Sequence, residues 1–131
     1  MTAAMDHATK PIKREDFKVD TAAKVPATRH KVRRLAAAFI APDTVDNVEW
    51  MLAEGLANAL IHGRGAATVT VTVDEKTLRV EVQDHGPGLL VARRTDHGRG
   101  LTIIEKLAAN WSLTTDDTGT CLWFEVDRVV L

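Results

Sequence analysis

The sequence predicts an α/β (α+β) two-layer sandwich, in which a mixed, mainly antiparallel sheet is covered on one face by three helices. Three observations support this fold. Two stretches with apolar residues at helical spacing lie in the first half of the chain, alternating β-branched stretches follow them, and short polar turns join the later strands. Hairpins pair strands antiparallel, and amphipathic helices bury their apolar side against a sheet. The 131 residues fit one domain, expected at 15–131 after a flexible tail over 1–14.

Hydrophobic periodicity predicts one strand and two helices in the first half of the chain. Alternation of apolar and charged residues marks the strand, and apolar residues recur three and four apart in both helices. The second helix is apolar on several sides, with Trp50 on one of them, so we expect it to be largely buried. These elements are expected over residues 15–20, about 26–42 and about 43–62.

In the second half of the chain, apolar residues recur at every second position, as they do in strands. Alternating β-branched residues on both sides of a polar turn predict one hairpin, and a second hairpin closes the chain. Between the hairpins lie a glycine-rich loop and a third helix. In chain order these elements are expected over 67–73, 78–83, 84–100, about 101–108, 111–115 and 121–126.

Composition indicates which partners the chain does not bind and in which cellular compartment it works. The formal net charge is −1, so the chain has no net positive charge that would attract nucleic acid or anionic lipid. A single cysteine, Cys121, excludes an intrachain disulfide and suits a reducing compartment. The N-terminal residues lack the apolar core of a signal peptide, and no apolar run has the length of a membrane helix. We expect a cytoplasmic protein that binds neither nucleic acid nor membrane directly.

Two polar side chains interrupt the apolar run over 50–61 of the second helix. Glu54 and Asn58 are four residues apart and therefore share one face. Burying them without partners would cost several kcal/mol, about 2–7 for each neutral polar group and more for a charge. As a site, the asparagine oxygen would ligate Mg²⁺ and the glutamate would polarise a water or a hydroxyl. The alternatives are a structural hydrogen-bonded pair or a helix face exposed to water.

Two glycine-rich motifs follow. In the first, Asp84, Gly86 and Gly88 come directly after a strand, where a carboxylate can accept a hydrogen bond from an exocyclic amine such as that of adenine. The alternative is a tight turn with a capping aspartate. In the second, over 97–101, glycines expose backbone amides at a helix start, where phosphate binds, and Arg99 adds a charged contact. It is neither a P-loop nor a dinucleotide fingerprint.

Together the motifs are far more specific than each one alone. In chain order they read E-x-x-x-N-A-L-I-H-G, D-x-G-x-G, G-x-G-L and then Gly119-Thr120. This order resembles the GHKL ATPase superfamily, whose ATP site is the Bergerat fold. Within it the chain is similar to the stand-alone anti-sigma-factor serine kinases and their small actinobacterial relatives. The resemblance covers about residues 15–127 and implies ATP and Mg²⁺ as ligands.

The resemblance also implies roles for individual residues. Glu54 stands at the position of the general base, Asn58 at that of the Mg²⁺ ligand, and Asp84 at that of the aspartate that reads the adenine amino group. The remaining nucleotide contacts are expected at Gly86, Gly88, Gly98, Arg99, Gly100, Leu101 and Thr120.

The activity that the resemblance implies is Mg-ATP-dependent serine/threonine protein kinase activity. The acceptor would be a serine of an anti-anti-sigma factor, and the chain would also sequester a sigma factor. Only residues 89–97 separate the glycine motifs, which is shorter than the usual lid of the sporulation and general-stress kinases. The short lid favours an alternative, a non-catalytic nucleotide-binding or docking module, whereas Glu54 favours the kinase. A homodimer through the first strand or helix is left open.

A third possibility is a metal-dependent hydrolase that uses Glu54 and Asp84. The sequence disfavours it, because it offers no cluster of His, Cys and carboxylate residues at metal-ligand spacing.

Overall fold

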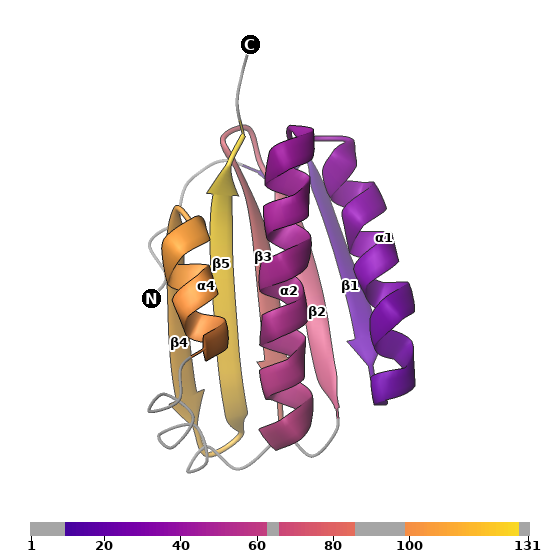
Figure 1. Ribbon diagram of the computed structural model, residues 1–131, viewed down its shortest axis with the longest axis vertical. Coiled ribbons are helices and arrows are strands. Elements are labelled where there is room, and N and C mark those ends of the chain that lie inside the picture. The colour runs from indigo at the N-terminus through magenta and orange to yellow at the C-terminus, as the bar shows by residue number, and fades with distance from the viewer. Residues whose placement is uncertain (1–9, 63–65, 86–98, 129–131) are drawn as a thin grey trace.

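A computed structural model describes residues 10–62, 66–85 and 99–128 of the chain. The elements in order are β1 (Lys13–Val19), a short 3₁₀ helix (Ala22–Lys24), α1 (Val25–Ala37), α2 (Pro42–His62), β2 (Ala67–Val73), β3 (Thr77–Asp84), α4 (Arg99–Leu107), β4 (Asn110–Asp116) and β5 (Gly119–Asp127). Figure 1 shows the three α-helices in front of the sheet.

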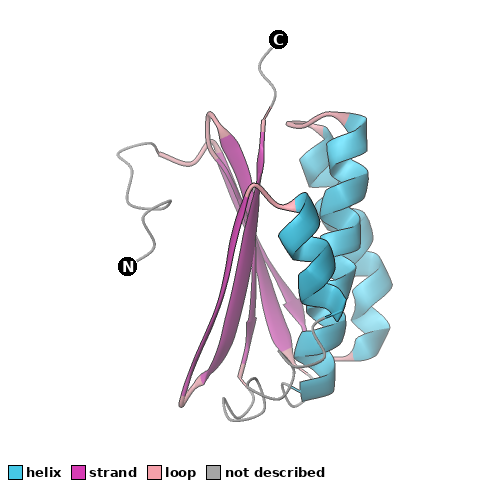
Figure 2. Cartoon of the chain, turned by 60° about the vertical axis from the view of Figure 1, so that its left-hand side comes forward, coloured by secondary structure: helices cyan, strands magenta, loops and turns pink. Residues whose placement is uncertain are grey.

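The two-layer fold predicted from the sequence is confirmed. Five strands form one sheet in the order β1-β2-β3-β5-β4, and the three α-helices lie together on one side of it (Figure 2). The sequence predicted a mixed, mainly antiparallel sheet, and all four pairings among the described strands are antiparallel. Because side chains alternate along a strand, one face of the sheet meets the helices and supplies half of the core.

Most of the helical side of the core comes from a stripe along α2, and Val32, Ala36 and Ile104 add to it from α1 and α4. The buried members of the α2 stripe recur at helical spacing and are Val45, Val48, Met51, Leu52, Leu56 and Ala59. The expectation that this helix is largely buried fails on the side of Trp50, which is 53% exposed. A helix in the outer layer of a two-layer fold has a sheet on one side only, so its far side faces water whatever residue stands there.

Two predicted boundaries shift. β1 begins at Lys13, inside the stretch 1–14 that we assigned to a tail, because Lys13 and Arg14 pair with β2 although their side chains are exposed. Residues 1–9 of that tail lie outside the described part. α2 begins at Pro42, one residue before the expected start at about 43. Proline suits the first helical position, because that amide would have no partner in the helix.

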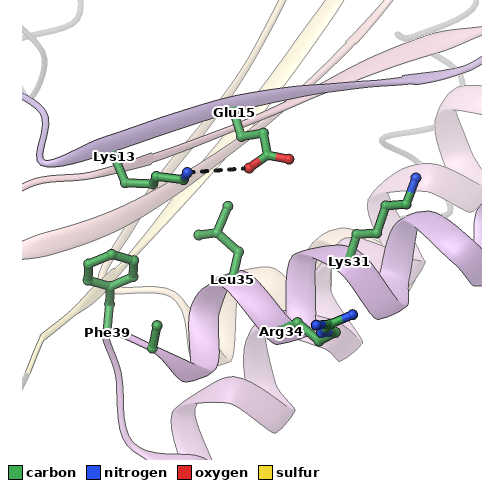
Figure 3. A pocket seen from close by; sticks show the side chains of 7 residues that line it. Lys13, Glu15, Lys31, Arg34, Leu35 and Phe39 are labelled. Carbon is green, nitrogen blue, oxygen red and sulfur yellow. Dashed lines mark ion pairs between the residues drawn. The ribbon is translucent and has the colours of Figure 1, made fainter.

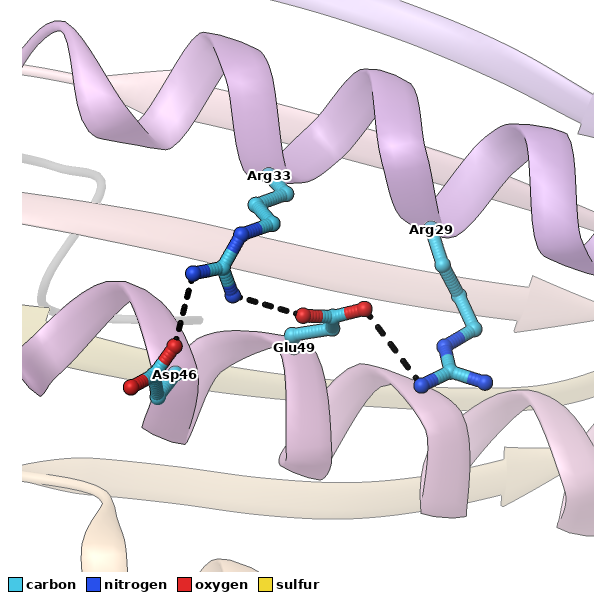
Figure 4. Close-up of polar contacts among 4 residues, drawn as sticks. All are labelled: Arg29, Arg33, Asp46 and Glu49. Carbon is cyan, nitrogen blue, oxygen red and sulfur yellow. Dashed lines mark hydrogen bonds and ion pairs between the residues drawn. The ribbon is translucent and has the colours of Figure 1, made fainter. Parts of the chain in front are cut away.

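An ionic cluster fixes α1 against one flank of α2. Arg33 of α1 contacts Asp46 at 2.8 Å and Glu49 at 2.7 Å, and Arg29 contacts the other oxygen of Glu49 at 3.4 Å (Figure 4). Hydrogen bonds to Asp46 and then to Glu49 raise the pKa of Arg33. One row of basic residues on α1 is therefore accounted for by helix packing.

Gly55 brings α2 close to the middle of the sheet. A Cβ at this position would lie 3.0 Å from Cδ2 of Leu122 and 3.6 Å from Cγ2 of Val82. These side chains belong to β5 and β3, so the glycine sets how near the helix lies to the two central strands.

We expect Gly55→Val to lower the free energy of unfolding by about 1–3 kcal/mol, because a bulkier side chain overpacks a close helix–sheet contact. The matched control is Ala57→Val, an exposed position on the same helix, where only helix propensity changes and the cost stays below about 1 kcal/mol. Urea unfolding of both variants measures the difference. Equal stability of the two variants would contradict the close packing described for Gly55.

Candidate functional site

A buried carboxylate stands where β3 ends. Asp84 is 4% exposed, and its Oδ1 accepts a hydrogen bond of 3.2 Å from the backbone N–H of Thr120. Thr120 lies directly opposite Asp84 in the pairing of β3 with β5 and is equally buried. Asp84 shares the inner face of β3 with Val82, because the two are two residues apart. The carboxylate therefore faces the helical layer.

Gly119 allows β5 to start against the end of β3. Its φ is +145°, a backbone conformation that residues with a side chain rarely adopt. A Cβ at this position would also collide with the backbone of Asp84 and lie 3.0 Å from Cα of His85. The sequence analysis named Gly119 only as the neighbour of Thr120 in the order of motifs. The close approach to β3 could not be predicted without the strand pairing.

Glu54 and Asn58 lie on the flank of α2 that faces away from α1. Around a helix of about 100° per residue, they stand about 140° and 180° from Glu49, which contacts α1. α4 lies along this other flank (Figure 1). Both side chains are half-buried, so neither is wholly removed from water as the apolar run had suggested.

The same end of the molecule holds Asp84 and the last turns of α2. Residues 63–66 join the end of α2 to Ala67, which pairs with Asp84. From Gly55, which packs above Val82, Asn58 lies about 4.5 Å further along the helix and Asp84 about 6.6 Å further along the strand. Asn58 therefore reaches the level of Asp84.

The N-terminus of α4 points to this end as well. α4 is followed by β4, and Ala109 just after the helix donates to the backbone oxygen of Glu125, at the far end of β5 from Thr120. The start of α4, at Arg99 and Gly100, therefore lies toward Thr120. Leu101 is half-buried and Ile104 is fully buried against the core. The predicted contacts Gly86, Gly88 and Gly98 lie outside the described residues.

The structure thus brings three predicted groups to one end of the sandwich: a buried aspartate, a helix flank with a glutamate and an asparagine, and a helix N-terminus. Among the described residues, no group of three or more His, Cys, Asp or Glu side chains is arranged to hold a metal ion. None of the helices in the described ranges combines the length and apolar character that crossing a membrane requires.

We expect Asp84→Ala to lower the free energy of unfolding by about 1–3 kcal/mol, because it leaves the buried amide of Thr120 without its acceptor. Asp84→Asn keeps a side-chain oxygen at that place and should recover most of the loss. Asp117→Ala, an exposed turn position, should change stability by less than about 0.5 kcal/mol. Chemical denaturation checks all three, and wild-type stability of Asp84→Ala would contradict the role of this hydrogen bond.

Comparisons with known proteins assign the chain to a family. The family described as "Histidine kinase-like ATPase domain" matches residues 18–126. An anti-sigma F factor of Clostridium acetobutylicum is 29% identical over 84 residues, which cover 52% of this chain and 59% of that protein. The chain therefore spans less than two thirds of that relative. The family match runs from β1 to β5 and includes the whole candidate site, and the chain belongs to the histidine kinase-like ATPase domain family.

Proposed function

We propose that this protein binds Mg-ATP at the Asp84 end of the sandwich and phosphorylates a serine of an anti-anti-sigma factor. In the same proposal it holds a sigma factor inactive, in the cytoplasm, when that serine is already phosphorylated. The observation that carries the proposal is the convergence of Asp84, the Glu54–Asn58 flank of α2 and the start of α4. The family match supports ATP binding, and the anti-sigma F factor relative supports the regulatory role.

The buried carboxylate suits a purine amino group. Asp84 accepts hydrogen bonds only, and burial at 4% exposure removes most competition from water. The amide of Thr120 orients its Oδ1, so the carboxylate cannot rotate freely. In this proposal Asp84 accepts the hydrogen bond from the adenine amino group, Thr120 lies beside it, and Gly86 and Gly88 allow the base and sugar to approach the backbone.

The phosphates would lie at the start of α4. Backbone N–H groups at a helix N-terminus favour anions, and Gly98, Gly100 and Leu101 contribute these groups in the proposal. Arg99 adds a positive charge. The oxygen of Asn58 is a hard donor of the kind that Mg²⁺ prefers, so Asn58 would hold the ion, which would offset the negative charge of the phosphates.

Glu54 is proposed as the general base. It lies one helical turn before Asn58 on the same flank, and its partial exposure leaves room for an incoming hydroxyl. ATP supplies the phosphoryl group. Glu54 would accept the proton of the serine hydroxyl as the serine oxygen bonds to phosphorus and ADP leaves.

The docking alternative rests on the short segment 89–97, which lies outside the described residues. No observation in the described part favours it over the kinase. The two alternatives differ in one measurable property, because a docking module needs no base at Glu54.

We expect Asp84→Asn to weaken ATP binding about 10-fold to 100-fold, because the amide presents N–H groups where the adenine amino group needs an acceptor. Asp117→Asn, which changes an exposed carboxylate in the β4–β5 turn, should leave the affinity unchanged. Asn58→Ala should weaken binding in the presence of Mg²⁺ and have little effect when the metal is chelated. Calorimetry measures all of these, and no binding by the wild type at millimolar ATP would contradict the nucleotide site.

We expect Glu54→Gln to slow phosphoryl transfer by about 10²–10⁴-fold while ATP affinity stays near that of the wild type, because the amide cannot take a proton. Glu105→Gln, an exposed position on α4, is the matched control and should transfer at the wild-type rate. Phosphoserine on a candidate anti-anti-sigma factor is the readout. Full activity of Glu54→Gln would remove the base assignment, and absence of transfer with intact partner binding would favour the docking module.

A further inference from the structure

The face of the sheet that carries no helix has a hollow of its own. Figure 2 shows the three α-helices on one side of the strands and the other side open. The hollow has a volume of about 380 Å³, at the small end of the range for ligand pockets. Its walls include Arg14, Thr72, Arg79, Glu81 and Trp123.

Arg79 is a buried cation on this open face. It stands between Leu78 and Val80, whose side chains are buried in the core, so its own side chain points to the opposite face. The side chain is only 3% exposed, and its Nε donates to Glu125 at 3.1 Å. Its Cζ lies 3.8 Å from the centre of the Trp123 ring.

Two buried donors in the hollow have no acceptor among the described residues. They are Nη2 of Arg79 and the indole Nε1 of Trp123. A buried donor without an acceptor costs free energy, most of all when it is charged. A ligand that brings an acceptor to this place recovers that cost, so the two donors point to a ligand with oxygen atoms.

The groove between β1 and α1 gives no comparable signal. Lys13 and Glu15 form an ion pair there at 3.8 Å, and their side chains are 48% and 47% exposed (Figure 3). Charged groups in contact with water are already solvated and need no ligand. The buried donors therefore distinguish the hollow on the open face from this groove.

Strand pairing places two arginines on either side of a short residue. Arg14, Thr72 and Arg79 are direct neighbours across β1, β2 and β3. The short side chain of Thr72 leaves room between the two long ones. The side chain of Arg14 is 63% exposed, and its ion pair with Asp16 is long, at 3.9 Å. Arg14 can therefore turn aside to admit a ligand and then close over it.

The next row of the same face carries the opposite charge. Asp16, Thr70 and Glu81 are paired across the same three strands, one step of about 6.6 Å from the row of arginines. Glu81 lines the hollow and pairs with Trp123 of β5. Cys121, also in the wall, adds no charge near neutral pH, because burial and then the nearby Glu81 raise its pKa. The hollow thus has a positive end and a negative end.

We propose that this hollow binds a free α-amino acid. The carboxylate of the ligand accepts hydrogen bonds from Nη2 of Arg79 and Nε1 of Trp123, and Arg14 closes over it. The ammonium group of the ligand faces Glu81. A negative group so close to the arginines disfavours a dianion such as phosphate and favours a ligand with charges of both signs. An apolar part of the ligand lies on the Trp123 ring.

This second site does not depend on the proposed function. The proposed nucleotide site faces the helical layer, whereas the hollow lies on the opposite face of the sheet. ATP binding and amino-acid binding can therefore be measured separately, and a failure of one says nothing about the other.

The test uses the full chain and small probes in NMR titrations. The chain has three tryptophans, so three indole N–H signals are expected, and Trp123→Phe identifies the one that belongs to the hollow. The probes are glycine and L-leucine. Two analogues each remove one charge of leucine, because L-leucinamide has no carboxylate and 4-methylpentanoate has no amino group.

We expect L-leucine to shift the Trp123 indole signal in a saturable way, and glycine to do so more weakly because it has no apolar side chain. Both analogues of leucine should bind about 10-fold or more weakly than leucine itself, since each leaves charged groups of the hollow without a partner.

Variants of the walls show whether the charges of the hollow carry the binding. Arg14→Gln and Glu81→Gln should each weaken the binding of L-leucine about 3-fold to 10-fold. The matched controls, Arg34→Gln and Glu105→Gln, change exposed charges in the helical layer and should stay within about twofold of the wild type.

Arg79 needs a paired change, because its removal alone would leave Glu125 buried without a partner. Arg79→Met/Glu125→Met replaces the ion pair by apolar side chains, a kind of change that often leaves a fold intact. We expect this variant to lose the binding of L-leucine while its thermal melting and its ATP affinity stay near those of the wild type.

Three results would overturn the inference. The first is no shift of the Trp123 signal with glycine or L-leucine at about 10 mM. The second is equal affinity for leucine and either of its analogues, which would show that the hollow does not read both charges. The third is wild-type affinity of both Arg14→Gln and Glu81→Gln, which would place the binding elsewhere.

Discussion

A hydrogen bond from the backbone of Thr120 to the carboxylate of Asp84 joins the start of β5 to the end of β3, and the proposed nucleotide site depends on it. This hydrogen bond requires β3 and β5 to lie close together where Asp84 pairs with Thr120. Gly119 permits that approach, because any side chain there would collide with the backbone of Asp84. A buried acceptor with a fixed orientation is what recognition of an amino group requires.

The helical layer contributes the remaining side chains of the proposed site at the same end of the molecule. Gly55 lets α2 lie close to Val82 and Leu122, and this contact sets the level at which Asn58 stands over the sheet. The ionic contacts of Glu49 with α1 fix the rotation of α2, so that Glu54 and Asn58 face α4. Residues that never touch a ligand therefore decide where the ligand-facing ones point.

Much of this arrangement could be predicted from the sequence, because each strand and helix has a clear period. The alternation of side chains over 67–73 determines which face of the strand packs against the helices. The spacing of Val48, Leu52 and Leu56 determines which side of α2 packs against the sheet. The exposure of Trp50 was missed, because an apolar residue on the outer side of a helix gives the same local pattern as a buried one. The start of β1 at Lys13 was missed for a related reason, because an edge strand can carry charged side chains on both faces.

The pairing of the basic residues of α1 could not be predicted. Arg29, Lys31, Arg33 and Arg34 form one basic cluster in the sequence, and only the docking of α1 on α2 shows that Arg29 and Arg33 pair with acidic residues of α2. The same holds for Gly119, whose neighbour in space is 35 residues away in the chain, at Asp84. Contacts between distant segments carry the information that local patterns lack.

A crystal structure of the full chain with Mg²⁺ and a non-hydrolysable ATP analogue would show whether the nucleotide binds at the Asp84 end of the sandwich. We expect the adenine amino group within hydrogen-bonding distance of Asp84, the metal ion coordinated by the side-chain oxygen of Asn58, and the phosphates at the start of α4. A purine bound away from the β3–β5 end, or a metal ion held by other residues with Asn58 turned aside, would contradict it.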